Sequence, residues 1–248
     1  MRNGVSLLIP FLLITSCFAL WGFANDVTSP MVKAFSKIFR MSVTEGALVQ
    51  VAFYLGYFVM AFPAALFIQR YSFKAGVMLG LLLYAIGALA FIPASYTGFY
   101  YPFLLAYFAM TCGLSFLETR CNPYIYCMGS ESTATQRLNM AQAFNPIGAL
   151  SGMYVAMFLV QAKMNPMDSA TRATLSDDMF ESVKAHDLSV LIQPYVYIGI
   201  VVLLILALIY FTRMPMDADT HSGKSLGRSL RELVGIGNYG EGGIGEYF

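Results

Sequence analysis

Charged residues are scarce in this chain. Asp, Glu, Lys and Arg make up 12% of its 248 residues, whereas soluble domains carry about 25%. The formal net charge is only +1, and no basic cluster is present, which argues against a nucleic-acid partner. With 58% hydrophobic residues, the composition predicts an integral membrane protein whose main surroundings are the lipid bilayer.

Residues for enzyme chemistry are also few. His186 and His221 both fall in polar segments, and neither pairs with a Cys or Asp motif. There is no nucleophile-base-acid arrangement and no phosphate-binding glycine loop. The cysteines lack metal-ligand spacing and are expected to be buried as small apolar residues; they are Cys17, Cys112, Cys121 and Cys127. We therefore expect neither an enzyme nor a bound cofactor or metal.

Long hydrophobic runs are abundant. A run of about 20 apolar residues crosses a bilayer, and six stretches meet this length: 6–32, 44–68, 73–94, 99–126, 137–160 and 191–211. The first run continues past signal-peptide length into Asn25-Asp26 without a small-residue cleavage site, so no cleavable signal is expected. The pattern predicts an all-α membrane protein with six transmembrane helices.

The connecting segments suggest an orientation and a domain division. Eight basic residues fall on one side: Arg2, Arg70, Lys74, Arg137, Arg213, Lys224, Arg228 and Arg231. Six fall on the other: Lys33, Lys37, Arg40, Lys163, Arg172 and Lys184. The positive-inside rule then predicts a cytoplasmic amino terminus. An acid-rich loop is expected over 163–187. Residues 1–212 form the predicted six-helix unit, and 213–248 a cytoplasmic linker with the truncated start of a seventh helix.

Glu118 is the strongest functional signal. A carboxylate at a helix midpoint in a membrane costs roughly 3 kcal/mol on insertion scales, and packing alone does not justify it. Low dielectric favours the neutral carboxyl group, which would let Glu118 hold a proton and release it when water or a sugar arrives. Arg120 lies nearby, but two residues along a helix it points to roughly the opposite face. We expect Glu118 to serve a transport pathway.

Other polar residues lie within the predicted helices. Asp26 follows Asn25 in the first helix and invites the same argument, although it could lie near the membrane surface. Gln142 and Asn145 offer amide groups suited to a neutral sugar, or serve as interhelical hydrogen bonds. Four aromatic residues are more typical of core than of sugar stacking: Trp21, Phe53, Tyr54 and Tyr57.

Small residues and prolines predict how the helices pack. Gly76 and Gly80 are four residues apart, and so are Gly148 and Gly152, the spacing that allows close helix approach in membranes. Pro123 and Pro146 are expected to bend their helices.

Two motifs carry a resemblance to a known family. Residues 117–123 (Leu-Glu-Thr-Arg-Cys-Asn-Pro) and 137–145 (Arg-Leu-Asn-Met-Ala-Gln-Ala-Phe-Asn) are similar to the fucose:proton symporter family of the major facilitator superfamily. Segments 53–58, 72–76 and 193–195 extend the likeness, in register, over nearly the whole chain.

The resemblance implies half of a twelve-helix transporter. The family has two six-helix halves around a central cavity that opens alternately to each side, and this chain resembles the amino-terminal half, with helices one to three and four to six as inverted repeats. It implies proton-coupled symport of a fucose-like hexose across the bacterial cytoplasmic membrane, with a carboxy-terminal half as partner. The proton-coupling residues would be Glu118 and Asp26, and the sugar-binding residues would be Gln142, Asn145, Asn25 and Asn122.

The sequence departs from the family pattern at two positions. Ser29 stands where the fucose symporter has its helix-one acid, so Asp26 would replace that acid from one turn earlier, or coupling would depend on Glu118 alone. Arg120 stands where the family has a small residue. Both departures leave galactose, glucose or another hexose open as the substrate.

Two other functions are compatible with parts of the sequence. A six-helix channel of the aquaporin type also has two Asn-Pro pairs, but Asn122-Pro123 and Asn145-Pro146 fall on successive helices, and a channel has no need of Glu118. The other alternative is an inactive half-size fragment, which the glycine-rich end of the chain favours.

Overall fold

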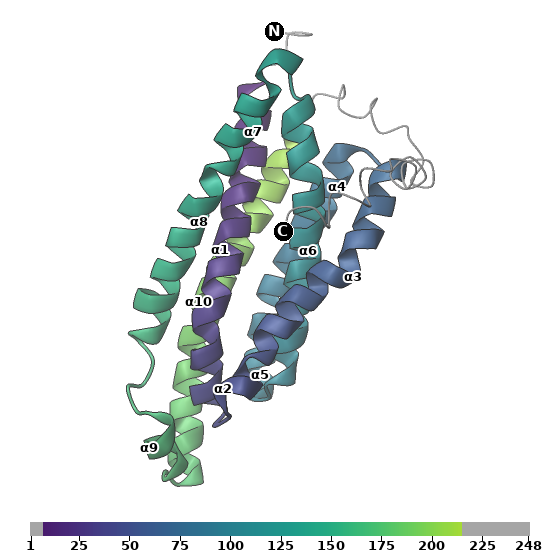
Figure 1. Ribbon diagram of the computed structural model, residues 1–248. Helices are drawn as coiled ribbons and strands as arrows, with labels where there is room; N and C mark the ends of the chain where they lie inside the picture. Colours follow the sequence, from purple (N-terminus) through teal and green to yellow (C-terminus); the bar gives the residue numbers. More distant parts are fainter. Residues whose placement is uncertain (1–6, 215–248) are drawn as a thin grey trace, which may run out of the picture.

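The computed structural model describes residues 7–214, and within them six helical segments are long and apolar enough to cross a membrane. Figure 1 shows these segments running side by side along one bundle. The predicted number of spans and the all-helical class are confirmed. Nearly all of the expected linker, from residue 215 onward, lies outside the described residues.

Several predicted spans are divided into shorter elements. The first, fourth and sixth spans are single helices: α1 (Leu8–Ile38), α6 (Tyr101–Cys127) and α10 (Asp177–Phe211). The second span contains α2 (Val43–Gly46) and α3 (Leu48–Arg70), and the third contains α4 (Phe73–Leu89) and α5 (Phe91–Thr97). The fifth contains η1 (Glu131–Thr133), α7 (Ala134–Gln142), α8 (Phe144–Tyr154) and the π-helix η2 (Val155–Gln161), and α9 (Ser169–Ala173) follows.

The sixth helix begins at Asp177, so the prediction that it begins at 191 was wrong. Its 35 residues extend over about 52 Å at 1.5 Å per residue, whereas the hydrocarbon core is roughly 30 Å thick. The first turns therefore project beyond the bilayer and are polar. Asp177 and Asp178 in the first turn stabilise this end because their charge opposes the positive pole of the helix dipole. The first helix likewise continues to Ile38 rather than 32.

Prolines explain two of the divisions. Pro93 and Pro146 have no backbone N–H, so the carbonyls of Leu89 and Gln142, four residues earlier, lose their helical partner. The α4 helix ends at Leu89, and α7 ends at Gln142. The break in the fifth span therefore falls at a residue that was expected to bind sugar.

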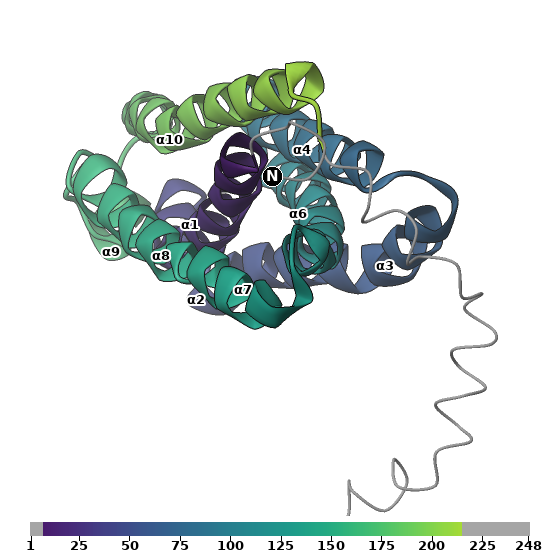
Figure 2. The ribbon, with the colours of Figure 1, turned by 90° about the horizontal axis from the view of Figure 1, so that it is seen from above.

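The two three-helix repeats of the bundle pack against each other in a reciprocal way. The main partner of α1 is α8, and α6 packs along both α3 and α4. The first helix of each three-helix repeat thus packs against the second helix of the other repeat. Figure 2, viewed from above, shows α1 and α6 inside the bundle, with α10 and α4 along one side of it. The predicted half of a major facilitator fold accounts for this arrangement.

Close helix approach depends on glycine at the α1–α8 crossing. A Cβ atom at Gly148 would lie 1.9 Å from the backbone oxygen of Ala19, and one at Gly22 would lie 2.0 Å from that of Asn145. A Cβ atom at Gly80 would likewise lie 2.9 Å from the Gly113 carbonyl oxygen, so α4 and α6 also approach closely. The predicted packing role of these small residues is confirmed.

The segment after η2 is held by a buried arginine. Arg172 donates from Nη2 to the Asn165 carbonyl at 2.8 Å, from Nε to the Met167 carbonyl at 3.1 Å and from Nη1 to the Lys37 carbonyl at 3.3 Å. Asp187, expected in a polar loop, instead lies buried within α10 and accepts from the Asn165 N–H at 2.8 Å. These contacts join α9 and α10 to the end of α1.

Candidate substrate and proton site

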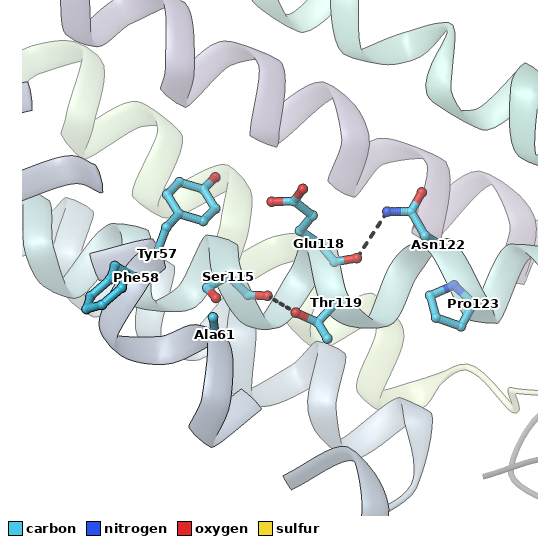
Figure 3. A pocket seen from close by; sticks show the side chains of 8 residues that line it. All are labelled: Tyr57, Phe58, Ala61, Ser115, Glu118, Thr119, Asn122 and Pro123. Carbon is cyan, nitrogen blue, oxygen red and sulfur yellow. Dashed lines mark hydrogen bonds between the residues drawn. The ribbon is translucent and has the colours of Figure 1, made fainter. Parts of the chain in front are cut away.

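Glu118 lies in α6 and is half-buried. Its carboxylate and the Tyr57 side chain of α3 point into the same open depression, which has a volume of about 610 Å³ (Figure 3). The remaining wall residues come from α3 and α6: Phe58, Ala61, Ser115, Thr119, Asn122 and Pro123. The depression thus combines one carboxyl group, hydroxyl groups and an amide with an apolar rim.

Glu118 also borders a narrow cleft against α1. This cleft is lined by Trp21 and Phe18 from α1 and by Leu117 from α6, together with Cys17 and Cys121. Glu118 therefore lies where α1, α3 and α6 meet.

A pair of amides connects α6 to the fifth span. Asn122 donates from Nδ2 to the Glu118 backbone carbonyl at 3.1 Å, and its Oδ1 accepts from Gln142 Nε2 at 3.0 Å. Gln142 is the last residue of α7, next to the break caused by Pro146, and is exposed. The sequence predicts each residue separately as sugar-binding, and the structure brings them together.

Asn145 is half-buried at the start of α8. Its Nδ2 donates to the Phe18 carbonyl of α1 at 3.4 Å. Because Phe18 also lines the cleft at Glu118, Asn145 lies behind the same part of α1. Its hydrogen bond to α1 is the interhelical type that was left open beside sugar binding.

Asn25 and Asp26 are half-buried further along α1. Seven residues separate Asn25 from Phe18, which places them on the same side of the helix, whereas Asp26 is turned by about 100° from Asn25. No hydrogen bond among the described residues joins either side chain to Glu118. Ser29 accepts from Gln50 Nε2 of α3 at 3.3 Å, so the position of the family's acid is engaged with α3.

Arg120 faces away from the site, as its spacing from Glu118 predicted. Its side chain is wholly buried, donates from Nη2 to the Tyr71 carbonyl at 3.0 Å and lies over the Phe73 ring at 4.8 Å. A Cβ atom at Gly76 would lie 2.4 Å from Arg120 Nε. This departure from the family pattern therefore supports the turn between α3 and α4.

The expectation that the aromatic residues are core holds for Phe53, holds in part for Trp21 and Tyr57, which are half-buried against the core, and fails for Tyr54. Phe53 is buried, but Tyr57 and Trp21 line the spaces beside Glu118, and Tyr54 is 64% exposed. Their proximity to Glu118 arises from helix packing, which periodicity alone does not reveal. The sequence could have identified Thr119 and Ser115 as site residues, because they lie within one helical turn of Glu118.

The predicted burial of the cysteines is confirmed for three of the four. Cys17, Cys112 and Cys121 are buried and Cys127 is half-buried, all as free thiols. Across residues 7–214, no group of three His, Cys, Asp or Glu side chains could hold a metal ion. The site as described can exchange a proton at Glu118 and offer hydroxyl and amide groups to a polyol.

The six-helix membrane bundle and its site define the class of protein: the chain belongs to the Major Facilitator Superfamily, which it matches over residues 12–238. Within it the chain is similar to the amino-terminal half of L-fucose-proton symporters. It is 46% identical over 247 residues to the L-fucose-proton symporter of Haemophilus influenzae, covering 97% of this chain and 58% of that protein. It is 36% identical over 236 residues to the L-fucose-proton symporter of Escherichia coli, covering 93% and 54%.

A solved structure agrees with this assignment. The major facilitator transporter FucP, in the outward conformation, superposes with a TM-score of 0.80 at 34% identity, over 94% of this chain and 57% of that one. The relatives carry the names of transporters, as the sequence predicted, and the family assignment removes the aquaporin-type channel. The chain spans just over half the length of these relatives.

Proposed function

We propose that this chain provides one half of a proton-coupled sugar symporter that works by alternating access in the bacterial cytoplasmic membrane. The observation that carries the proposal is the placement of Glu118: a carboxyl group inside an apolar helix, half-buried in a depression with hydroxyl and amide neighbours. Such a group is costly in a membrane and is expected to be functional. The relatives named as L-fucose-proton symporters favour a fucose-like hexose.

Each polar residue has a distinct proposed role. Glu118 carries the coupled proton and, when ionised, accepts a hydrogen bond from a sugar hydroxyl. Gln142 and Asn122 act as a linked pair, in which Asn122 holds the Gln142 amide and leaves its Oε1 as an acceptor for a sugar hydroxyl. Asn145 and Asn25 contact the sugar from the fifth span and from α1. Asp26 supplies a second carboxyl group on α1 and takes part in proton coupling.

A second six-helix half would complete the pathway. The depression at Glu118 is open on one side, and binding sites of such transporters lie between their repeats at the membrane midplane. The amino terminus is cytoplasmic in this proposal, which places Arg70, Lys74 and Arg137 on the cytoplasmic side, as the positive-inside rule favours.

The test is external alkalinisation of de-energised cells on addition of fucose, galactose or glucose. Cells would express this chain with and without a supplied carboxy-terminal half. Sugar-driven alkalinisation only with the second half supports the proposal and names the sugar. A signal from this chain alone would refute the need for a second half. Silence in both, with the protein present in the membrane, would contradict symport of these sugars and favour the inactive fragment.

A further inference from the structure

A second cavity lies on another side of the bundle from Glu118. It has a volume of about 330 Å³, at the small end of the range for ligand pockets, roughly 300–1,000 Å³. Its walls come from α1, from η2 and from α10, and it shares no lining residue with the depression at Glu118. Figure 2 shows α8 and α10 on separate sides of α1.

Helix packing explains why this groove is open. At Gly199 a Cβ atom would lie 2.9 Å from Leu89 Cδ2, so α10 approaches α4 closely at this level. On the other side, η2 is a π-helix, a form whose single turns often occur at functional sites. Because α10 packs mainly along α4 rather than along η2, a gap remains between α10 and η2.

The walls of the groove are apolar along most of their length. Phe23 and Leu159 face it from α1 and η2, and Val201 faces it from α10. Leu159 and Val201 are 40% and 42% exposed. In a protein that spans the bilayer, apolar surface of this kind meets lipid chains rather than water.

One end of the groove is polar and positively charged. Lys163, Gln193 and Tyr197 line it there. No ion pair among residues 7–214 involves Lys163; the two ion pairs found there join Asp187 to Arg172 and Glu181 to Lys184. His186 Nε2 lies 3.4 Å from the Lys163 carbonyl oxygen, so the imidazole ring lies beside this end.

We propose that this groove binds one anionic phospholipid. An acyl chain occupies the apolar part between η2 and α10, and the lipid phosphate meets the Lys163 ammonium group, with Gln193 and Tyr197 as hydrogen-bond donors. The occupant is a lipid because the groove combines a lipid-facing apolar wall with a basic group at one end that forms no ion pair within residues 7–214. Basic pockets between transmembrane helices bind acidic lipid head groups elsewhere by this chemistry.

Native mass spectrometry tests the proposal on the purified 248-residue chain in mild detergent. Phosphatidylglycerol and phosphatidylcholine with identical acyl chains would be titrated separately. We expect about fivefold tighter retention of phosphatidylglycerol, the equivalent of one basic residue near an acidic head group. The Lys163→Gln variant should lose this preference and still bind both lipids equally.

Two further variants separate the groove from general surface charge. Lys33→Gln removes an exposed positive charge at the same end of the bundle but outside the groove, and should keep the preference. Leu159→Trp should fill the apolar part of the groove and weaken the binding of both lipids. Val201→Phe serves the same purpose if the Leu159→Trp variant does not fold. Equal effects of Lys33→Gln and Lys163→Gln would overturn the proposal, as would unchanged binding in the filled variants. Displacement of the lipid by a supplied carboxy-terminal half would also overturn it and assign the groove to a contact between halves.

Discussion

The guanidinium Nη2 of Arg172 lies 2.7 Å from Oδ2 of Asp187, and neither side chain is exposed. The two residues come from α9 and α10, and Arg172 also donates to the Lys37 carbonyl at the end of α1. A buried charge pair is stable only when its remaining polar atoms are satisfied. Here three backbone carbonyls and the Asn165 N–H supply those partners.

Removing one partner of this pair should destabilise the protein strongly. Arg172→Met leaves Asp187 as an uncompensated buried charge, so we expect a loss of about 3–5 kcal/mol in the free energy of unfolding. Unfolding in denaturing detergent measures it. The matched control is Glu181→Gln, which breaks the more exposed pair with Lys184 and should cost about 0–1 kcal/mol. An equal loss of unfolding free energy in both variants would show that the buried pair contributes no more to stability than the exposed pair.

Glu118→Gln should abolish sugar-driven proton movement in the complete transporter. The amide keeps the size of the side chain and one accepting oxygen but cannot exchange a proton. External alkalinisation measures coupling, and binding of labelled sugar to the purified transporter should be retained. Glu131→Gln changes an exposed carboxylate in η1 and should leave coupling intact. Normal alkalinisation by Glu118→Gln would remove Glu118 from the mechanism.

Asn122→Ala should weaken sugar binding while leaving the proton-to-sugar ratio unchanged. The Gln142 amide loses its partner at 3.0 Å and samples other orientations. One neutral hydrogen bond contributes about 1 kcal/mol, so the KM for sugar should rise roughly fivefold. Thr119→Ala, which removes a hydroxyl bonded to the Ser115 carbonyl in the same depression, reports the effect of a polar loss without the link to Gln142. A changed proton ratio in Asn122→Ala would contradict a positioning role.

Gly148→Leu should separate α1 from α8. Even a Cβ atom there would meet the Ala19 carbonyl oxygen at 1.9 Å, and that backbone cannot rotate away as a side chain could. Overpacking costs typically about 1–3 kcal/mol, and more where backbone must move. The yield of folded protein and its melting temperature measure the effect. Leu150→Ala, at a site 67% exposed two residues later, should change neither by a comparable amount.

Trp21 offers an optical test of the site. It is the chain's only tryptophan and lines the cleft beside Glu118, so its emission reports on that cleft alone in this half. A transported sugar should exclude water and shift the emission to shorter wavelengths, whereas a sugar that drives no proton movement should not. Unchanged emission at saturating transported sugar would place the sugar away from Trp21.

The sequence predicts the parts of this molecule that depend on local pattern. Runs of apolar residues located all six spans, and the position of Arg120 two residues from Glu118 placed it correctly on another face. Helix ends that leave the bilayer were misjudged, as at Asp177, because hydropathy reports contact with lipid and not helix formation. The pairing of Arg172 with Asp187 and the meeting of Asn122 with Gln142 join different helices, so no local pattern reveals them. The roles of Glu118, Asp26 and the amides remain predictions.

The reciprocal pairing of helices also constrains how the chain is made. Ala19 and Gly148 touch across α1 and α8, yet roughly 130 residues separate them, which is about 6–26 s of synthesis at 5–20 residues per second. During that interval the first helix is in the membrane without its principal partner, and the glycine face that will receive α8 is open to lipid. A ribosome stalled before residue 148 therefore leaves an intermediate that a membrane-embedded chaperone or protease can engage.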